Sequence, residues 1–338
     1  MKNCTSVSEK IYETSKTGTR IMKAAVCESP GKYSIKAFPV PTPGANEILV
    51  HLKGCGICSS NLPVWEGRPW FKYPLEKGAP GHEGWGKIEE TGSDVKSYFP
   101  GQWVALLSQN AFAEYNVVSE NMVVPIPSQL EGMCLPGEPL GCAINIFNRC
   151  NIRKGQNVAV VGAGFIGLIL SSLALREGAN VVVISRNRSA LKFAQRIGVE
   201  NTVEYDGSAE DSLKIKNRLC QDGYDCVIEA TGYQKPLDLA GELVKIRGRL
   251  IIAGYHQDGF RSVNMQSWNW RGIDVINAHE REPQICMNGV RAALKAVERK
   301  QLDLQPFFTH IYTLDKINEA FDTALNRPEG FVKALVML

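Results

Sequence analysis

One glycine-rich turn constrains the fold of this chain more than any other segment. The residues Gly162, Gly164, Phe165, Ile166 and Gly167 follow the apolar run 158–161 and precede the helix-like stretch 168–175. In a strand–turn–helix unit, the first glycine permits the tight turn and the second lets the backbone approach a pyrophosphate. The third glycine allows close helix–strand packing, and the helix N-terminus attracts the anion. The pattern predicts a dinucleotide site at these five residues, and a glycine turn without a ligand is the weaker alternative.

The sequence around this turn alternates between apolar strands and helical stretches. After the strand at 158–161, further strands are predicted at 181–184, 226–228 and 250–253, with helices at 190–197 and 237–244. Such alternation indicates a parallel sheet with helices on both faces and a ligand at the carboxyl ends of the strands. We therefore expect an α/β fold with a Rossmann-type, doubly wound domain over residues 141–279.

The sequence on either side of this domain has a different residue pattern. Short β-rich runs at 47–52, 103–107 and 113–118 are separated by Gly and Pro turns, which is typical of a mostly β domain. Beyond residue 280, helical runs at 290–299 and 316–325 lead to an apolar strand at 331–338 that would return to complete this domain. The expected second domain thus comprises residues 21–140 and 280–338. Residues 1–20 are polar and are expected to form a mobile tail.

Length and charge limit the classes of partner. A chain of 338 residues is longer than one hydrophobic core usually supports, so two domains are expected. The net charge of +3 is too small to favour a nucleic-acid or membrane partner, and a small-molecule partner is expected. The sequence has no apolar run of about 20 residues and no secretory signal in its first twenty residues, so a cytoplasmic protein is expected.

Two short segments carry the donors that zinc prefers. Cys58 lies in Gly-Ile-Cys-Ser-Ser, and His82 and Glu83 lie in Gly-His-Glu-Gly. Thiolate, imidazole and carboxylate are the usual ligands of catalytic zinc, although each residue by itself is ordinary in a protein core. Cys55 and Cys58 also form a C-x-x-C pair, but a redox pair would open a helix within a βαβ unit, so this alternative is the weaker one.

Taken with the glycine turn, these segments resemble the zinc-dependent medium-chain dehydrogenase/reductase family from about Met22 to Leu338. The resemblance implies that the mostly β domain is GroES-like and catalytic. It implies zinc ligands at Cys58 and His82 and a carboxylate at Glu83 that can enter the inner shell. It also implies that Glu138 is a further ligand or a residue that holds a water molecule. A glutamate at position 138 resembles the polyol branch of the family, but Glu138 followed by proline would also suit a helix cap.

The resemblance assigns further roles. Ser60 would relay the substrate proton, and His279 would face the substrate and the nicotinamide. Thr231, Gly254 and Lys333 would contact the cofactor, together with the glycine turn. The family's four-cysteine lobe for a structural zinc is missing from residues 106–112, so one catalytic zinc per chain is expected.

The strand end after the first helix bears on the choice of cofactor. The strand at 181–184 is followed by Ser185, Arg186 and Arg188 where an NAD enzyme would place an acidic residue. A carboxylate there would repel a 2′-phosphate, whereas a guanidinium attracts one. The sequence therefore favours NADP(H) over NAD(H), with solvated surface arginines as the alternative.

Together these features predict a zinc-dependent oxidoreductase that transfers a hydride between a nicotinamide cofactor and a secondary alcohol or ketone. A homo-oligomer, either a dimer or a tetramer, is expected. A polyol, sugar or cyclitol would suit a polar cleft containing Glu83, His279 and Trp65. The alternatives are a zinc-independent quinone or enoyl reductase of the same fold, a non-catalytic nucleotide-binding protein, and a metal-dependent lyase. A zinc-independent reductase would not need the Cys58 and His82 pair, and a metal-dependent lyase would not need the dinucleotide turn.

Overall fold

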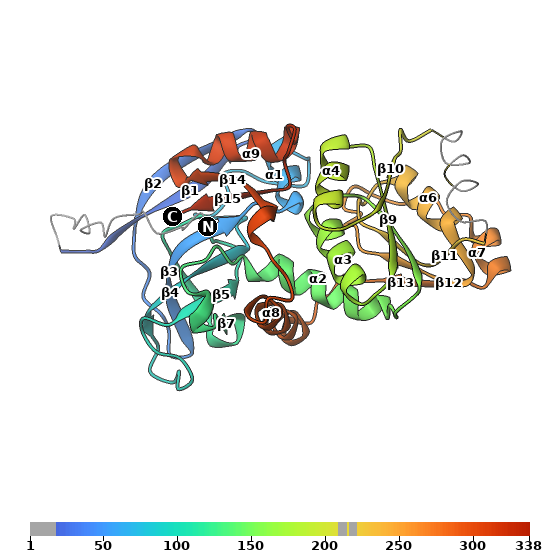
Figure 1. Cartoon of the computed structure of the whole chain (residues 1–338). Helices are drawn as coiled ribbons and strands as arrows, with labels where there is room; N and C mark the ends of the chain where they lie inside the picture. The colour runs from blue at the N-terminus through green and yellow to red at the C-terminus, as the bar shows by residue number, and fades with distance from the viewer. Residues whose placement is uncertain (1–17, 209–214, 216–221) are drawn as a thin grey trace. The chain divides into compact units, whose positions relative to one another are not determined.

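The computed structural model describes residues 18–208, 215 and 222–338. Its contacts divide the chain into two compact units (Figure 1). The first unit contains the described residues up to Gly141 together with Glu282–Leu338, and the second unit is Cys142–Arg281. Most of the expected tail lies outside the described residues. Its last residue, Arg20, is part of the fold, because the guanidinium pairs with Glu89 at 2.7 Å and with Glu90 at 3.0 Å.

The second unit contains a parallel six-stranded sheet in the order β10-β9-β8-β11-β12-β13. The chain runs outward from β8 in one direction and then returns to continue from β11 in the other, which is the doubly wound arrangement that the sequence predicts. The strands are β8 Asn157–Val161, β9 Asn180–Ser185, β10 Asn201–Glu204, β11 Tyr224–Glu229, β12 Val244–Ile252 and β13 Asp274–Asn277.

Helices cover both faces of this sheet. Figure 1 shows α3 and α4 on one side and α6 on the other, and α3 and α4 contact β8, β9 and β10. The helices are α3 Phe165–Arg176, α4 Arg188–Arg196, α6 Gln234–Leu243 and α7 Met265–Arg271. One predicted boundary is wrong: Val244 begins β12 and does not end a helix. The charged residues Lys245, Arg247 and Arg249 interrupt the apolar pattern by which the early part of this strand would have been recognised.

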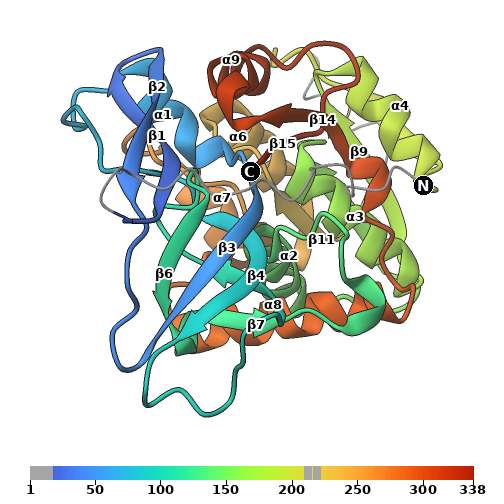
Figure 2. The ribbon, with the colours of Figure 1, turned by 90° about the vertical axis from the view of Figure 1, so that its left-hand side faces the viewer.

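The first unit is built around a seven-stranded sheet in the order β14-β15-β3-β4-β5-β7, with β6 also pairing with β3. In Figure 2, β3 lies between β6 and β4. The hairpin β1-β2 forms a separate two-stranded sheet. The strands are β1 Ile21–Ser29, β2 Lys32–Pro39, β3 Glu47–Gly56, β4 Glu83–Thr91, β5 Trp103–Leu107, β6 Tyr115–Ser119, β7 Val123–Pro125, β14 Phe308–Thr313 and β15 Lys333–Met337.

The C-terminal strand β15 joins the first unit by pairing with β3 antiparallel and with β14 parallel. The helices of this part of the chain are α1 Leu62–Glu66, α2 Gly137–Cys150, α8 Pro283–Glu298 and α9 Ile317–Asn326, and α2 continues into the second unit. None of the helices in the described ranges has the length and apolarity needed to cross a membrane.

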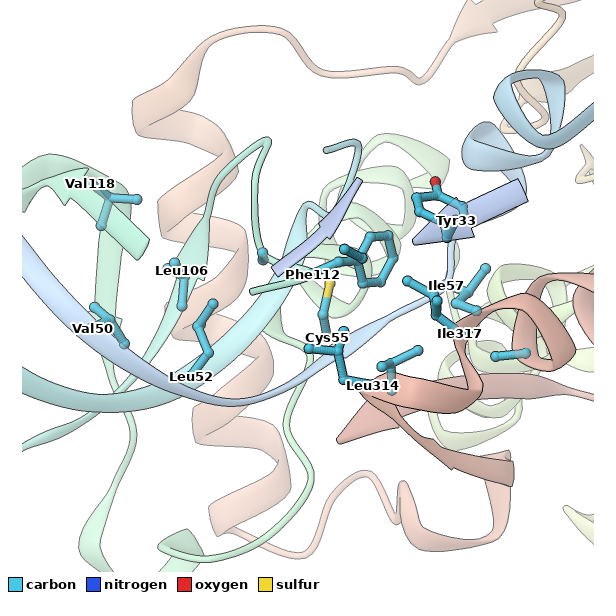
Figure 3. Packing of buried hydrophobic residues seen from close by; sticks show 14 of the residues in the cluster. Tyr33, Val50, Leu52, Cys55, Ile57, Leu106, Phe112, Val118, Leu314 and Ile317 are labelled. Atoms are coloured by element: carbon cyan, nitrogen blue, oxygen red, sulfur yellow. The ribbon is translucent and has the colours of Figure 1, made fainter. Parts of the chain in front are cut away.

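Apolar side chains from distant segments form the core of the first unit. Figure 3 shows Val50, Leu52 and Leu106 of the sheet within the same cluster as Leu314 and Ile317. This packing places the segment that follows β3 beside the segment that leads to β15, because burial of their apolar side chains is the main favourable contribution to the fold. The candidate metal residues lie on the chain directly beyond these strand ends.

Candidate active site

Three donors that are far apart in the sequence meet at one end of the β3-β4 pair. Gly56, the last residue of β3, lies opposite Glu83, the first residue of β4. Cys58 follows β3 by two residues and His82 precedes β4 by one. One ligand atom from each of Cys58, His82 and Glu83 lies within 4.8 Å of the others. The antiparallel register therefore explains why these segments meet.

Hydrogen bonds determine the orientation of the His82 ring. Nδ1 lies 3.0 Å from the carbonyl oxygen of Pro80, which only accepts, so Nδ1 carries a proton and Nε2 is the ring nitrogen that a metal could bind. Asn61, nearly buried, donates to the same carbonyl at 3.1 Å. Burial would lower the pKa of His82, but the hydrogen bond and charge of Cys58, with Glu138 and Glu83, raise it to about 10. The donors thus form an environment that attracts positive charge.

Glu83 is completely buried and its two oxygens differ. Oε1 accepts a hydrogen bond of 2.6 Å from Nζ of Lys333, whose side chain is also buried. Oε2 has no hydrogen-bond partner among the described residues. A Cβ on Gly56 would lie 1.9 Å from Oε2, so only glycine at position 56 leaves the carboxylate in place. A buried carboxylate oxygen without a partner is costly, and a metal ion would satisfy it.

The structure places Lys333 against Glu83, and its contact with the cofactor stays a prediction. Burial would lower the pKa of Lys333, but the charges of Glu83 and Cys58 outweigh that effect and raise it. The ammonium therefore stays protonated and neutralises one oxygen of the carboxylate. This pairing over 250 positions of sequence has no local signal, so sequence reasoning missed it.

Glu138 lies in the first turn of α2 and is half-buried. Its negative charge raises the pKa of both His82 and Lys333, so it is part of the same electrostatic environment. It is not one of the three residues whose ligand atoms meet within 4.8 Å. Glu138 could therefore be a carboxylate that binds the metal only part of the time or acts from outside its ligand shell. It could equally be a residue that stabilises the start of α2.

The remaining predicted residues of the first unit have distinct surroundings. Ser60 is half-buried, two residues beyond Cys58. Trp65 does not line a polar cleft: it is 5% exposed, stacks on Tyr33 at 5.7 Å and donates to Asp322 at 3.2 Å. Cys55 is a buried free thiol whose pKa burial raises, which argues against a redox pair with Cys58.

In the second unit, the glycine turn has the geometry that its sequence predicts. Gly162 adopts φ +117°, in the region that favours glycine, and a Cβ on Gly167 would lie 2.0 Å from the Gly162 carbonyl oxygen. A Cβ on Gly164, in contrast, would meet no atom within 4 Å. Phe165 and Ile166 then open α3. The turn thus leaves space at the position where the backbone would approach a phosphate.

The two arginines after β9 differ in their partners. Arg188 opens α4, and its Nε lies 2.7 Å from a carboxylate oxygen of Glu204 on β10. Arg186 is exposed and forms no ion pair with any described residue. Ser185 accepts a hydrogen bond of 3.2 Å from the Asn187 backbone N–H. Within the described part of the chain, the Arg188 guanidinium is thus paired with a carboxylate and that of Arg186 is not.

A buried network at the carboxyl ends of β11 and β12 was missed. Glu229 is completely buried and accepts hydrogen bonds from the backbone N–H and the hydroxyl of Thr231. His256 Nε2 lies 3.0 Å from Glu229, and His256 Nδ1 accepts from Arg261 at 2.9 Å. Gly254 donates to the Glu229 backbone carbonyl at 2.8 Å. The network holds the segments containing Thr231 and Gly254 in one arrangement.

His279 follows β13 in the second unit and is exposed, with its ring stacked on Tyr255 at 5.6 Å. Partial burial, followed by the charge of Arg281, lowers the pKa of His279. The imidazole is therefore neutral near pH 7 and offers either a donor or an acceptor to a ligand.

Two models of dehydrogenase domains match the chain. Residues 44–128 match the model of the alcohol dehydrogenase GroES-like domain, and residues 166–293 match that of the zinc-binding dehydrogenase. Sorbitol dehydrogenase of Homo sapiens is 26% identical over 336 residues, covering 88% of this chain and 91% of that protein. D-arabinitol dehydrogenase 1 of Uromyces fabae is also 26% identical, covering 90% and 95%.

Solved structures share the fold. Galactitol-1-phosphate dehydrogenase from Escherichia coli superposes with a TM-score of 0.81 at 22% identity, covering 94% of this chain and 100% of that one. A zinc-binding dehydrogenase from Sinorhizobium meliloti bound to NADP gives 0.82 at 24% identity, covering 94% and 99%. Because the two matching domain models together span more than half of the sequence, the chain belongs to the zinc-dependent medium-chain dehydrogenase/reductase family of alcohol and polyol dehydrogenases.

Proposed function

We propose that this chain is a zinc-dependent dehydrogenase that transfers a hydride between a nicotinamide cofactor and a secondary alcohol or ketone, with a polyol, sugar or cyclitol as substrate. The observation that carries the proposal is the meeting of Cys58, His82 and Glu83, with one buried oxygen of Glu83 unpartnered among the described residues. The relatives named sorbitol dehydrogenase and D-arabinitol dehydrogenase support the choice of substrate class.

Each residue of the first unit has a proposed task. Cys58, His82 and Glu83 would hold zinc, with Glu138 as a further or exchanging ligand. When bound, zinc would supply Lewis acidity toward an alcohol or carbonyl oxygen. The Ser60 hydroxyl would accept the proton that leaves the alcohol as its hydride passes to the nicotinamide, and His279 would contact substrate and nicotinamide. One group of three donors occurs among the described residues, so we propose one zinc per chain.

The cofactor proposal is NADP(H). Two observations support it: β9 ends without a carboxylate, and the Arg186 guanidinium has no ion-pair partner among the described residues. A 2′-phosphate needs a cation and is repelled by an acidic residue. Gly162, Gly164 and Gly167 would accommodate the pyrophosphate. We also propose a cytoplasmic location. We propose a homo-oligomer as well, because β13 lies at an edge of the parallel sheet and exposes Val275, which would suit contact with a second copy.

The test is a panel of polyols, sugars, cyclitols and their ketones, followed by nicotinamide absorbance with NADP(H) and with NAD(H). Activity on polyols that Cys58→Ala abolishes is the expected result. A zinc-independent reductase would instead reduce quinones or enones and retain its activity in Cys58→Ala. A protein that binds the cofactor but turns over none of these compounds, and no quinone or enone, would contradict the proposal.

A further inference from the structure

Three polar side chains and one tight turn of the second unit form a closed ring of hydrogen bonds. The ring joins Glu229 at the end of β11, His256 and Arg261 beyond β12, and the backbone of Gly232. Glu229 is completely buried, and the side chains of His256 and Arg261 are each 15% exposed. All four residues lie within residues 142–281, so the ring belongs to one compact unit.

The donors and acceptors of the ring fix the state of the His256 imidazole. Arg261 Nε can only donate, so His256 Nδ1 accepts from it at 2.9 Å. The proton of the neutral ring is then on Nε2, which donates to Glu229 Oε2 at 3.0 Å. Glu229 Oε1 accepts from the Gly232 N–H at 2.9 Å, and Arg261 Nη2 donates to the Gly232 carbonyl at 2.8 Å. The ring therefore holds both the N–H and the carbonyl of Gly232.

The turn that the ring holds lies against the glycine turn after β8. β8 and β11 are neighbours in the parallel sheet, and the Ala230 N–H donates to the Val161 carbonyl at 2.9 Å. A Cβ on Gly162 would lie 2.7 Å from the methyl carbon of Thr231. The Thr231 hydroxyl donates to Glu229, so the methyl group is the part of Thr231 that faces Gly162. The buried carboxylate thus determines the surface beside the glycine turn.

The ring also holds the segment that follows β12. Gly254 donates to the backbone carbonyl of Glu229 at 2.8 Å, and a Cβ on Gly254 would lie 2.2 Å from the Gly232 nitrogen. A Cβ on Gly232 would lie 2.5 Å from the Tyr255 carbonyl oxygen. Glycine at both positions lets the two backbones pack this closely. The segments after β11 and β12 are therefore held as one piece.

A buried polar network stabilises a single arrangement when all of its members are paired. Burial would raise the pKa of Glu229, but the hydrogen bonds from His256, Thr231 and Gly232 outweigh that effect and lower it. The carboxylate therefore stays charged and accepts every one of these bonds. Loss of one donor would leave a buried acceptor unpaired, which is costly, and would free the turn.

We propose that His256 and Arg261 are positioning residues of the dinucleotide site, which hold the turn 231–232 and Gly254 in the arrangement that the nucleotide requires. They act through Glu229 and the backbone of the turn, without contact with the nucleotide. Segments that are ordered beforehand cost less free energy to bind a ligand. This inference rests on the proposed function, since it takes the glycine turn as the site of the cofactor.

Two substitutions of His256 separate its two hydrogen bonds. The amide nitrogen of His256→Gln reaches the position of Nε2 and can still donate to Glu229. The amide oxygen of His256→Asn reaches the position of Nδ1, so it keeps the bond from Arg261 and loses the one to Glu229. By fluorescence titration, His256→Asn should bind NADP(H) and NAD(H) about 10- to 100-fold more weakly, whereas His256→Gln should stay within about threefold.

Arg261→Met is compared with Arg271→Met, which removes an arginine of the same unit with a purely structural role. Arg271 donates to the carbonyls of Val244 at 2.6 Å and Gly241 at 2.7 Å, at the start of β12 and away from the ring. Thermal unfolding should show a loss of stability in both variants. Arg261→Met alone should weaken the binding of both cofactors, by about 10-fold or more.

The inference would be overturned if Arg261→Met and His256→Asn bound both cofactors as tightly as the unmutated protein. Equal losses in Arg261→Met and Arg271→Met would also overturn it, because the effect would then follow stability alone. If Arg261→Met does not fold, the two His256 variants decide by the same titration. Weaker cofactor binding in the ring variants of a protein that turns over no alcohol or ketone would count against the proposed function alone.

Discussion

At the scale of single residues, the buried pair of Glu83 and Lys333 dominates the candidate site. The carboxylate is inaccessible to solvent, the ammonium nearly so, and Nζ lies 2.6 Å from Oε1. Removing one partner of such a pair leaves an uncompensated charge in a medium of low dielectric constant, which costs much more than an exposed ion pair contributes. The same ammonium keeps one oxygen of Glu83 occupied, so the other oxygen is the one available to a metal.

Lys333→Met should therefore lower the free energy of unfolding by about 3–5 kcal/mol. The matched control is Lys316→Met, which breaks the exposed pair with Glu319 and should leave the free energy of unfolding nearly unchanged. Urea unfolding of the chelator-treated protein measures both changes without any contribution from zinc. Similar values for the two variants would show that Glu83 is not a buried, charge-dependent residue.

A second residue-scale prediction concerns pH. Burial, followed by the positive charge of Lys53, lowers the pKa of His51 from 6.5 to about 4. The unfolded chain therefore binds the proton first, and stability present above pH 6.5 is lost as the pH falls toward 4. Urea unfolding at several pH values should give a shallower slope over this interval for His51→Gln than for the unmutated protein. An identical slope would mean that the pKa of His51 is the same in the folded and the unfolded chain.

At the scale of elements, the proposed site residues lie at the ends of strands and helices. The antiparallel register of β3 and β4 brings Cys58, His82 and Glu83 together, and the parallel strands of the second unit present their carboxyl ends to the glycine turn. The start of α2 and the end of β9 then add Glu138 and Arg186. Each of these two positions has both a structural and a functional explanation, which substitutions can separate.

Glu138→Gln keeps the shape of the side chain and removes its charge. If Glu138 serves the metal, the variant should lose zinc affinity and most of its turnover while its melting temperature changes little. Competition with a chelator and thermal unfolding measure the two effects. A lower melting temperature with normal turnover would identify Glu138 as a residue that only stabilises the start of α2.

At the end of β9, Arg186→Ala should weaken NADP(H) binding by about one to two decades, because a charge-assisted hydrogen bond contributes about 1.5–3 kcal/mol. Arg188→Ala is the matched control and should have a smaller effect, since Glu204 already engages that guanidinium. Binding of NAD(H) should change little in either variant. If the unmutated protein bound NAD(H) as tightly as NADP(H), or more tightly, the proposal of NADP(H) as cofactor would be contradicted.

At the scale of the whole molecule, the metal donors and the dinucleotide turn belong to different compact units. Cys58, His82 and Glu83 lie in the first, and Gly162, Gly164 and Gly167 in the second. Each unit has its own sheet and its own apolar core. Binding of zinc and binding of the nucleotide should therefore be separable by substitution, because neither set of residues needs the other to be positioned.

Cys58→Ala should accordingly abolish turnover and zinc binding but leave the affinity for NADP(H) within about threefold, a difference below about 1 kcal/mol. Elemental analysis should give about one zinc in the unmutated protein, and fluorescence titration gives the affinity. Gly164→Val provides the reciprocal control, with weakened nucleotide binding and unchanged zinc content. Two tightly held zinc ions, or loss of nucleotide binding in Cys58→Ala, would contradict this division.

Local pattern was sufficient for much of the fold. The glycine turn, the alternation of strands and helices and the β-rich flanks depend on spacings within a few residues, so they can be recognised before any tertiary contact forms. The same holds for the zinc-type donors at 58, 82 and 83, whose residue types indicate their chemistry. The resemblance to a known family added the roles that these patterns leave open.

Only tertiary structure decided which residues share an environment. Lys333 pairs with Glu83 across 250 positions, Arg327 reaches Ser59 across 268, and Trp65 packs into the core. Arg188 pairs with Glu204 while Arg186 has no such partner among the described residues. These contacts arise when β15 closes on β3 and when β10 aligns with β9, and burial and charge pairing at such junctions leave no mark on the local sequence.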